Sequence, residues 1–253
     1  MSAARPPAWY LVSLRARGDH RALRRAAARH GGGLLALSPW TLRPRDDATS
    51  RQALAGALQA PVLVFTSPAA ARAAAALQAL RPGPGQQWLA VGAGTAAALR
   101  RAGVDAVQAP SRMDSEGLLA LPALAHAREV GLVTAPGGRG MLTPALEARG
   151  TRVIRADVYD RVPLPLAAVA IDRLLALDTP AAVALSSGEA LQQVLAQLPG
   201  TAAAILRHAT AVAASERLAA LARDSGWTQV VVAGSPRPAA LAAAAAQALP
   251  SRV

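Results

Sequence analysis

Residues 62–80 read Val-Leu-Val-Phe-Thr-Ser-Pro-Ala-Ala-Ala-Arg-Ala-Ala-Ala-Ala-Leu-Gln-Ala-Leu. The first part, 62–66, is a short apolar run typical of a buried strand, and the Ala/Leu-rich part, 69–80, is typical of a helix. A strand followed at once by a helix is the building unit of an α/β protein.

The same alternation extends along the whole chain and predicts an α/β fold with parallel sheets flanked by helices on both faces. The expected strands are Trp9–Leu14, Gly33–Leu37, Val62–Thr66, Trp88–Gly92, Val104–Ala109, Val130–Thr134, Arg152–Val158, Ala182–Ser186, Ala209–Ala213 and Gln229–Ala233. The expected helices include Ala69–Leu80, Thr95–Ala102, Glu116–Ala127, Gly140–Arg149, Glu189–Leu198 and Glu216–Asp224.

The chain also resembles itself at an offset of 120 residues. Residues 64–68 (Val-Phe-Thr-Ser-Pro) match 184–188 (Ala-Leu-Ser-Ser-Gly), and 90–95 match 210–215. We therefore expect two similar lobes. The repeat leaves open whether each lobe is contiguous or whether the N-terminal unit joins the C-terminal half.

Composition excludes much of the common catalytic chemistry. The 253 residues contain no cysteine, and all 27 basic residues are arginine. Thiol catalysis, cysteine-ligated metals, lysine Schiff bases and the P-loop lysine are therefore excluded. No histidine has metal-ligand spacing to another histidine or to a carboxylate, so no metal is expected. His20 and His30 lie in an Arg-rich stretch and are expected at the surface.

The formal charge of +12 favours anionic partners. The arginines are scattered and aromatic residues make up 3%, so nucleic acid is not expected as a partner. The apolar runs Trp9–Leu14 and Ala239–Leu249 are shorter than the ~20 residues of a membrane span. We expect a cytoplasmic protein with no membrane contact.

Small hydroxyl and glycine residues follow the predicted strands, where helix N-termini point. They are Thr66 and Ser67, Gly92–Thr95, Gly137, Gly138 and Arg139, Ser186 and Ser187, Ser215, and Ser235. Any one of them is explained as a helix cap. Together, in a basic protein, they predict a ligand with several carboxylates or phosphates.

Two residue patterns suggest more specific chemistry. Gly92-x-Gly94-x-x-Ala97 resembles a dinucleotide fingerprint without its acidic residue, and Ser111 and Arg112 leave NADP as an alternative. Tyr159 is one of only two tyrosines and ends the strand Arg152–Val158, where the chain could pass between lobes. A core tyrosine is the alternative interpretation.

Segments in order along most of the chain resemble the uroporphyrinogen-III synthase family in its proteobacterial form. They are 12–15 (Val-Ser-Leu-Arg), 65–67 (Phe-Thr-Ser), 91–95 (Val-Gly-x-Gly-Thr), 114–119 (Asp-Ser-Glu-Gly-Leu-Leu), 136–139 (Pro-Gly-Gly-Arg), 146–150 (Leu-x-x-Arg-Gly), 158–161 (Val-Tyr-Asp-Arg), 187–193 (Ser-Gly-Glu-x-Leu-Gln-Gln), 215–219 (Ser-Glu-Arg-Leu-Ala) and 226–227 (Gly-Trp).

The resemblance implies two α/β lobes joined by a two-stranded connection. Residues 1–39 with 162–253 would form the first lobe and residues 42–158 the second. The active-site cleft would lie between them. It would bind hydroxymethylbilane, a linear tetrapyrrole with acetate and propionate groups on every ring.

The implied reaction is a hydro-lyase reaction of haem biosynthesis, which closes the macrocycle with inversion of ring D and loss of water. No metal or organic cofactor would be used. Tyr159 would help the hydroxyl depart, and Arg15, Thr66, Ser67, Gly137, Gly138, Arg139, Ser186 and Ser187 would hold carboxylates. Ser215 would bind substrate or only cap a helix.

Besides the substrate, the expected partner is the upstream deaminase, through transient contact. The default oligomeric state is a monomer. Two other functions stay open. One is a non-catalytic two-lobed receptor for a small polyanion, and the other is an NADP-linked enzyme that uses residues 92–97.

Overall fold

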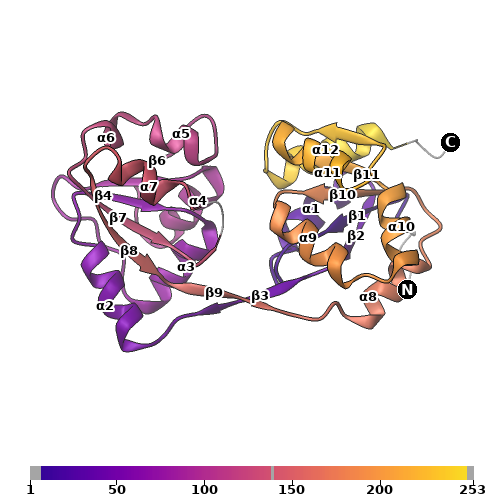
Figure 1. Ribbon diagram of the computed structural model, residues 1–253, viewed down its shortest axis with the longest axis horizontal. Coiled ribbons are helices and arrows are strands. Elements are labelled where there is room, and N and C mark those ends of the chain that lie inside the picture. Colours follow the sequence, from indigo (N-terminus) through magenta and orange to yellow (C-terminus); the bar gives the residue numbers. More distant parts are fainter. Residues whose placement is uncertain (1–6, 138–139, 250–253) are drawn as a thin grey trace. The chain divides into compact units, whose positions relative to one another are not determined.

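The computed structural model describes residues 7–137 and 140–249. The chain divides into two compact units, each with its own sheet and helices (Figure 1). Unit 1 comprises Met1–Thr41 and Pro163–Val253, and unit 2 comprises Leu42–Val162.

Unit 1 contains a parallel sheet with the strand order β12-β11-β10-β1-β2 among the described residues. Its strands are β1 (Trp9–Ser13), β2 (Gly32–Ala36), β10 (Ala181–Leu185), β11 (Thr210–Ala213) and β12 (Val230–Val232). Its helices are α1 (Arg21–Ala28), α8 (Ala168–Leu175), α9 (Gly188–Gln197), α10 (Gly200–His208), α11 (Glu216–Asp224) and α12 (Pro238–Ala248).

Unit 2 contains a second parallel sheet with the order β6-β5-β4-β7-β8 in the part of the chain that is described. Its strands are β4 (Val62–Phe65), β5 (Gln87–Ala90), β6 (Val107–Gln108), β7 (Glu129–Thr134) and β8 (Arg152–Asp157). Its helices are α2 (Ala48–Ala57), α3 (Pro68–Leu77), α4 (Ala93–Arg101), α5 (Ser115–Leu119), α6 (Pro122–Ala125) and α7 (Leu142–Glu147).

The two sheets have the same topology. β4, β5 and β6 of unit 2 occupy the places of β10, β11 and β12 in unit 1, and β7 and β8 those of β1 and β2. The matches at an offset of 120 residues thus pair equivalent strands. The predicted α/β fold with two similar lobes is confirmed.

Strand β4 shows why the central strands read as continuous apolar runs. Leu63 and Phe65 pack with α2, α3 and α4 on one face of the sheet, and Val62 and Val64 pack with the residues of α5, α6 and α7 on the other. Both faces are buried, as in parallel sheets generally, so the run shows no polar alternation. Phe65 stacks on Trp88 of β5 with ring centroids 5.4 Å apart.

The chain crosses between the units through a two-stranded sheet of β3 (Trp40–Pro44) and β9 (Tyr159–Pro163). Beside it, the Arg45 amide donates to the Val158 carbonyl at 3.0 Å, and the Arg45 guanidinium pairs with Asp160 at 2.7 Å. The periodicity of the sequence did not reveal these strands, because neither is buried on both faces and each carries polar residues.

Several predicted elements are shorter than expected, and two of them have a clear local cause. The single helix predicted over Glu116–Ala127 is interrupted, because Pro122 forces Leu121 into an extended conformation between α5 and α6. The strand predicted over Val104–Ala109 is only Val107–Gln108, because the Val104 amide caps α4 by donating to the Leu99 carbonyl at 3.1 Å.

Among the described residues, no helix combines the length and the apolar character needed to cross a bilayer.

Candidate functional site

Each sheet has one point at which the order of the strands reverses. In unit 2 this point lies between β4 and β7, and in unit 1 it lies between β1 and β10. Ligands of open α/β sheets bind beyond the carboxyl ends of the strands at such a point, because the flanking connections run in opposite directions and leave a crevice. The residues that follow these four strands are therefore the candidates.

In unit 2 a pocket of about 170 Å³ lies at the carboxyl ends of β4 and β7. Its lining residues are Thr66, Ser67, Ser115, Leu132, Thr134, Ala135, Gly137, Gly140, Met141, Leu142, Thr143, Arg155, Tyr159 and Arg161. Four predicted site residues thus line one pocket: Thr66, Ser67, Gly137 and Tyr159.

The two central strands are tied together at the base of this pocket. The Thr66 amide donates to the Val133 carbonyl at 3.2 Å, which continues the β4–β7 ladder by one residue. The Thr66 hydroxyl donates to the Thr134 hydroxyl at 2.7 Å. Each threonine oxygen retains a lone pair, so this pair can still accept a hydrogen bond from a ligand.

Ser67 and Tyr159 form the second polar pair of the pocket. The Ser67 hydroxyl oxygen accepts from the Ala70 amide at 3.0 Å and caps α3. The same oxygen lies 3.2 Å from the Tyr159 hydroxyl. Ser67 therefore caps α3 and also lines the pocket.

Tyr159 begins β9 and is only 4% exposed. Its ring packs in the core with the residues of α2, α3 and α4, while its hydroxyl reaches the pocket. A buried ring holds the hydroxyl in one place, since the side chain has little freedom to rotate. The ring is therefore a core side chain, as the alternative interpretation has it, and the hydroxyl lines the pocket.

Gly137 lines the pocket with a φ of 81°, a backbone conformation that favours glycine. It follows β7 and is exposed. Gly138 and Arg139, also predicted to contact the ligand, lie outside the described residues.

Several lining residues were not predicted from the sequence. Thr134 ends β7, and Arg155 donates to the Ala135 carbonyl at 3.1 Å while pairing with Asp157. Arg161 lies two residues after Tyr159 on β9, and side chains two apart on a strand share a face. Because periodicity did not reveal β9, this spacing could not select Arg161; its one signal was its place in the segment 158–161 that resembles the family.

In unit 1, Ser186 and Ser187 follow β10 at its carboxyl end. Ser187 caps α9 by accepting from the Ala190 amide at 3.2 Å. Ser67 makes the same capping arrangement at the start of α3 in unit 2. The two turns therefore match in backbone chemistry, as the internal repeat predicts.

Arg15 follows β1, the strand beside β10. Its Nη1 atom lies 3.3 Å from Asp19 Oδ2, and the Arg15 side chain is about one quarter exposed. Its Nε atom is buried and has no hydrogen-bond partner among the described residues. A buried, unsatisfied donor on a charged group is costly, and an anionic ligand oxygen would remove that cost.

Ser215 lies apart from both reversal points. It follows β11, is exposed, and makes no side-chain capping bond, although its carbonyl accepts from the Leu218 and Ala219 amides. Its two expected roles were substrate binding and capping, and the structure shows no cap from its hydroxyl.

His20 is buried, and its expected surface position is wrong. Its Nδ1 lies 2.9 Å from the Ser13 hydroxyl and its Nε2 lies 2.8 Å from the Ser38 hydroxyl. Desolvation lowers the pKa of His20, with Asp19 opposing and Arg24 and Arg15 adding to the shift. The Arg-rich neighbours of His20 suggested exposure, but the residue immediately precedes α1 and its ring turns inward.

The glycine turn at 92–95 follows β5, one strand away from the reversal point. The Gly92 backbone is extended, and an added Cβ would lie 3.1 Å from the Met113 side chain. Packing against Met113 therefore explains Gly92 without a ligand. In the described part of the chain, no group of three or more acidic or histidine side chains is arranged to hold a metal ion.

Comparisons with known proteins identify relatives of this chain. Residues 21–243 match the family model described as uroporphyrinogen-III synthase HemD. A curated relative, uroporphyrinogen-III synthase of Escherichia coli (strain K12), is 31% identical over 150 residues. That match spans 58% of this chain and 61% of the relative.

Solved structures share the fold. A mutant uroporphyrinogen III synthase from the extremely thermophilic bacterium Thermus thermophilus matches with a TM-score of 0.62 and 21% identity, over 95% of this chain and 98% of that one. The uroporphyrinogen-III synthetase of Helicobacter pylori matches with a TM-score of 0.56 and 16% identity, over 92% and 95%. The family match extends over most of the chain, and this protein therefore belongs to the uroporphyrinogen-III synthase family.

Proposed function

We propose that the protein catalyses the reaction for which its family is named: closure of hydroxymethylbilane to uroporphyrinogen III, with inversion of ring D and loss of water. The observation that carries the proposal is the Tyr159 hydroxyl, held by Ser67 at the strand-reversal pocket of a family member. The enzyme is then a hydro-lyase of haem biosynthesis.

Tyr159 acts on the leaving hydroxyl of the substrate. When the carbon–oxygen bond breaks, the pyrrole nitrogen supplies the electron pair and the departing oxygen takes up a proton, leaving as water. The Tyr159 hydroxyl donates a hydrogen bond or that proton. The substituted α-carbon of ring D then attacks the azafulvenium carbon and forms a spiro intermediate. The bond from this α-carbon to its original methylene bridge breaks, the free α-carbon of ring D bonds to that bridge carbon, and loss of the proton from the free α-carbon restores the pyrrole.

The remaining groups bind carboxylates and hold ring D in position. The amide groups at the starts of α3 and α9, the turn at Gly137 and the Arg15 guanidinium all present donors. Gly138, Arg139, Ser186 and Ser215 belong to the same predicted set. Hydroxymethylbilane closes unaided to the type I isomer, so the protein must mainly position the substrate. A hundredfold preference corresponds to only about 2.7 kcal/mol.

The test generates hydroxymethylbilane in situ with the upstream deaminase, then oxidises the products and separates the uroporphyrin isomers by chromatography. We expect type I without this protein and type III with it. Type I alone in the presence of folded protein would contradict the proposal. Binding of uroporphyrin without conversion of the bilane would then identify the alternative, a receptor for a small polyanion.

A nicotinamide cofactor has no role in this proposal. Titration with NADPH, followed by its fluorescence, is expected to show no saturable binding. Transient contact with the deaminase, the monomeric state, the cytoplasmic location and a substrate held by residues of both units remain predictions.

A further inference from the structure

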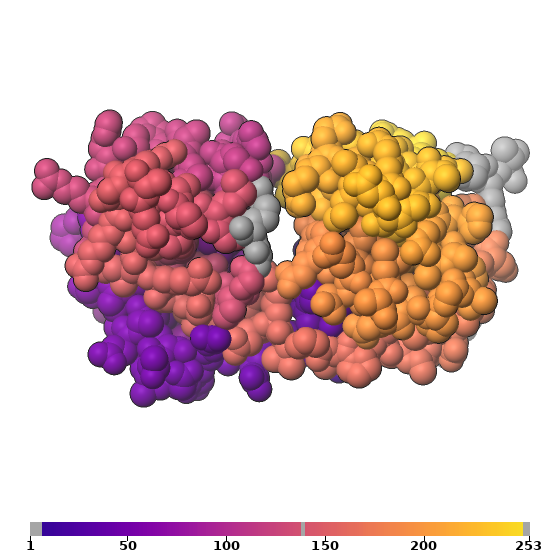
Figure 2. All heavy atoms as spheres, in the orientation of Figure 1, coloured from indigo at the N-terminus to yellow at the C-terminus, as the bar shows by residue number. Residues whose placement is uncertain are grey.

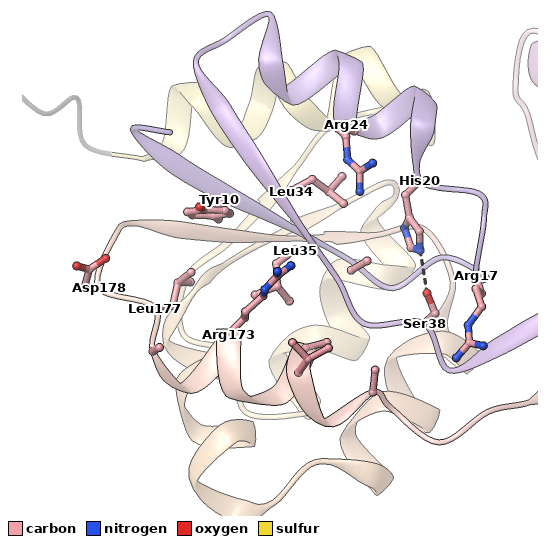
Figure 3. A pocket seen from close by; sticks show the side chains of 15 residues that line it. Tyr10, Arg17, His20, Arg24, Leu34, Leu35, Ser38, Arg173, Leu177 and Asp178 are labelled. Atoms are coloured by element: carbon pink, nitrogen blue, oxygen red, sulfur yellow. Dashed lines mark hydrogen bonds between the residues drawn. The ribbon is translucent and has the colours of Figure 1, made fainter. Parts of the chain in front are cut away.

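A second, larger hollow lies wholly within unit 1. It has a volume of about 810 Å³ and runs along the outer edge of the sheet, where β2 is the last strand (Figure 3). Its walls come from β2, from α1 with the turn before it, and from α8 with the turn after it. None of the residues assigned above to the substrate lines it.

Three arginines surround this unit 1 hollow. Arg24 approaches from α1 and Arg173 from α8 on the opposite side, and Arg17 lies near its end beside Ser38 (Figure 3). Within the described residues, none of the three guanidinium groups forms an ion pair or a side-chain hydrogen bond. The acidic residue in the lining is Asp178, so the hollow carries net positive charge.

His20 adds no charge to the hollow at neutral pH. Both of its ring nitrogens contact serine hydroxyls, and burial lowers its pKa. The positive charge therefore comes from the arginines. All three arginines are exposed, so water solvates their charges in the unliganded protein.

The walls between the arginines are apolar. Leu34 and Leu35 of the edge strand β2 line one side, with Leu35 largely buried, and Leu177 and Val169 contribute from the α8 side. Val169 is 59% exposed, an unusual degree for a valine. Helix α8 lies at the surface of unit 1, in salmon along its lower edge in Figure 2. A hollow that combines apolar walls with unpaired cations suits a ligand that has an apolar part and an anionic part.

We propose that the unit 1 hollow is a binding site, separate from the substrate site, for an organic anion with an apolar body. The size of the hollow lies within the roughly 300–1,000 Å³ typical of small-molecule pockets. An inorganic anion would satisfy the arginines but leave Val169 and the half-buried Leu34 in contact with water. An uncharged apolar molecule would leave the arginines unpaired.

The test uses 1-anilinonaphthalene-8-sulfonate, an apolar body with one sulfonate, followed by its fluorescence on the full chain. We expect one saturable site. Arg24→Gln and Arg173→Gln should each weaken binding about tenfold, which corresponds to about 1.4 kcal/mol. The matched control is Arg25→Gln, because Arg25 lies on the same helix as Arg24 but outside the lining, and it should bind like the unchanged protein.

A second pair of variants tests the apolar wall. Val169→Glu places a carboxylate in the hollow and should weaken binding at least tenfold. Leu175→Glu is its control, because Leu175 is exposed on α8 but does not line the hollow. The neutral analogue N-phenyl-1-naphthylamine and sulfate alone should each bind at least tenfold more weakly than the probe.

Equal affinity of all variants for the probe would overturn the proposal, because binding would then occur elsewhere. The formation of uroporphyrinogen III should be unchanged in Arg173→Gln. A parallel loss of that activity and of probe binding would show that the hollow belongs to the substrate site and would overturn its separate status. Thermal unfolding confirms that each variant is folded, and each Arg→Gln variant should be at least as stable as the unchanged protein without ligand.

Discussion

The hydroxyl groups of Ser67 and Tyr159 lie 3.2 Å apart, although 92 residues separate them in the chain. Ser67 also caps α3, so one oxygen fixes both the start of that helix and the position of the tyrosine hydroxyl. The contact joins a turn of the unit 2 sheet to the first residue of the connecting strand β9.

We expect Tyr159→Phe to slow the formation of uroporphyrinogen III about tenfold without abolishing it. The variant removes one donor at the leaving hydroxyl, and a tenfold loss corresponds to about 1.4 kcal/mol, the scale of a single hydrogen bond. The measurement is the initial rate of type III formation with the deaminase-coupled assay. Tyr10→Phe changes the only other tyrosine and serves as the control. Full activity in a folded Tyr159→Phe variant would show that this hydroxyl has no role.

Ser67 and Tyr159 should act as a coupled pair. We expect the combined effect of Ser67→Ala and Tyr159→Phe on kcat/KM to be smaller than the sum of the two single effects, by about 0.5–1 kcal/mol. Asp47→Ala is the control for lost capping, since Asp47 caps α2 by accepting from the Ser50 amide and is not assigned to the substrate, and each cap should contribute about 1 kcal/mol of stability. If the effects of the two substitutions on kcat/KM simply add, the 3.2 Å contact between Ser67 and Tyr159 does not contribute to catalysis.

Arg15→Gln should raise the KM for hydroxymethylbilane about tenfold and change kcat little, because a carboxylate contact is made in both the bound substrate and the transition state. Added salt should reduce the difference between the two proteins. Arg21→Gln, on the exposed surface of α1, is the control. Removing the buried, unpartnered Nε of Arg15 should cost less than about 1 kcal/mol of stability, because that donor already lacks a partner among the described residues. An unchanged KM would remove Arg15 from the substrate site.

Unit 1 should lose stability on mild acidification through His20. Its folded pKa lies below its ordinary value of 6.5, because burial disfavours the charged ring. His20 therefore binds a proton more tightly in the unfolded chain than in the folded protein. The free energy of unfolding falls as the pH drops from 6.5 toward the folded pKa, and the stabilising contribution of neutral His20 is fully present above pH 6.5. Urea titrations across this range measure it. His20→Gln should flatten the pH dependence, whereas His30→Gln, at an exposed position, should leave it as steep as before.

Gly131→Ala should destabilise unit 2 by about 2 kcal/mol or more, because the new Cβ would overlap the Ala57 carbonyl oxygen. This position is the close approach of β7 to α2 and does not depend on a positive φ. Gly56→Ala is the contrasting variant, since its Cβ would make only ordinary contact, 3.9 Å from Ile154. Within α2 it should stabilise by about 0.5–1 kcal/mol. Denaturant midpoints compare the two variants, and equal effects would contradict the packing of α2 on β7.

Much of the fold was predictable because its signals are local. A parallel strand buried on both faces is an uninterrupted apolar run, so β4, β7 and β10 stand out, as do Ala-rich helices such as α3. The connecting strands β3 and β9 lack that signal, because their pairing depends on residues more than a hundred positions apart. His20 was misplaced for a related reason: its burial depends on Ser13 and Ser38, which reach it only after the chain folds.

The pocket of unit 2 contains several of the residues selected from the sequence. Thr66, Ser67, Gly137 and Tyr159 were each selected as turn or strand-end residues, and all four line one pocket. Ser215 was selected by the same rule but follows β11, away from the reversal point. The same small and hydroxyl residues occur in the turns after most strands. Without the strand order, the sequence therefore cannot tell which of these turns lie at a ligand site.

By itself the sequence determined the alternation of strands and helices and the duplicated unit. It also determined that the chain has many arginines to bind anions and has no cysteine or lysine. These follow from residue types and short-range periodicity. Only the tertiary structure decided which strand ends lie together. It also decided that the Tyr159 ring is buried while its hydroxyl reaches Ser67. The arrangement of Arg17, Arg24 and Arg173 around one hollow likewise depends on the folded chain. The physical reason is that strand order places residues far apart in the chain side by side, and the energy of those contacts exists only in the folded protein.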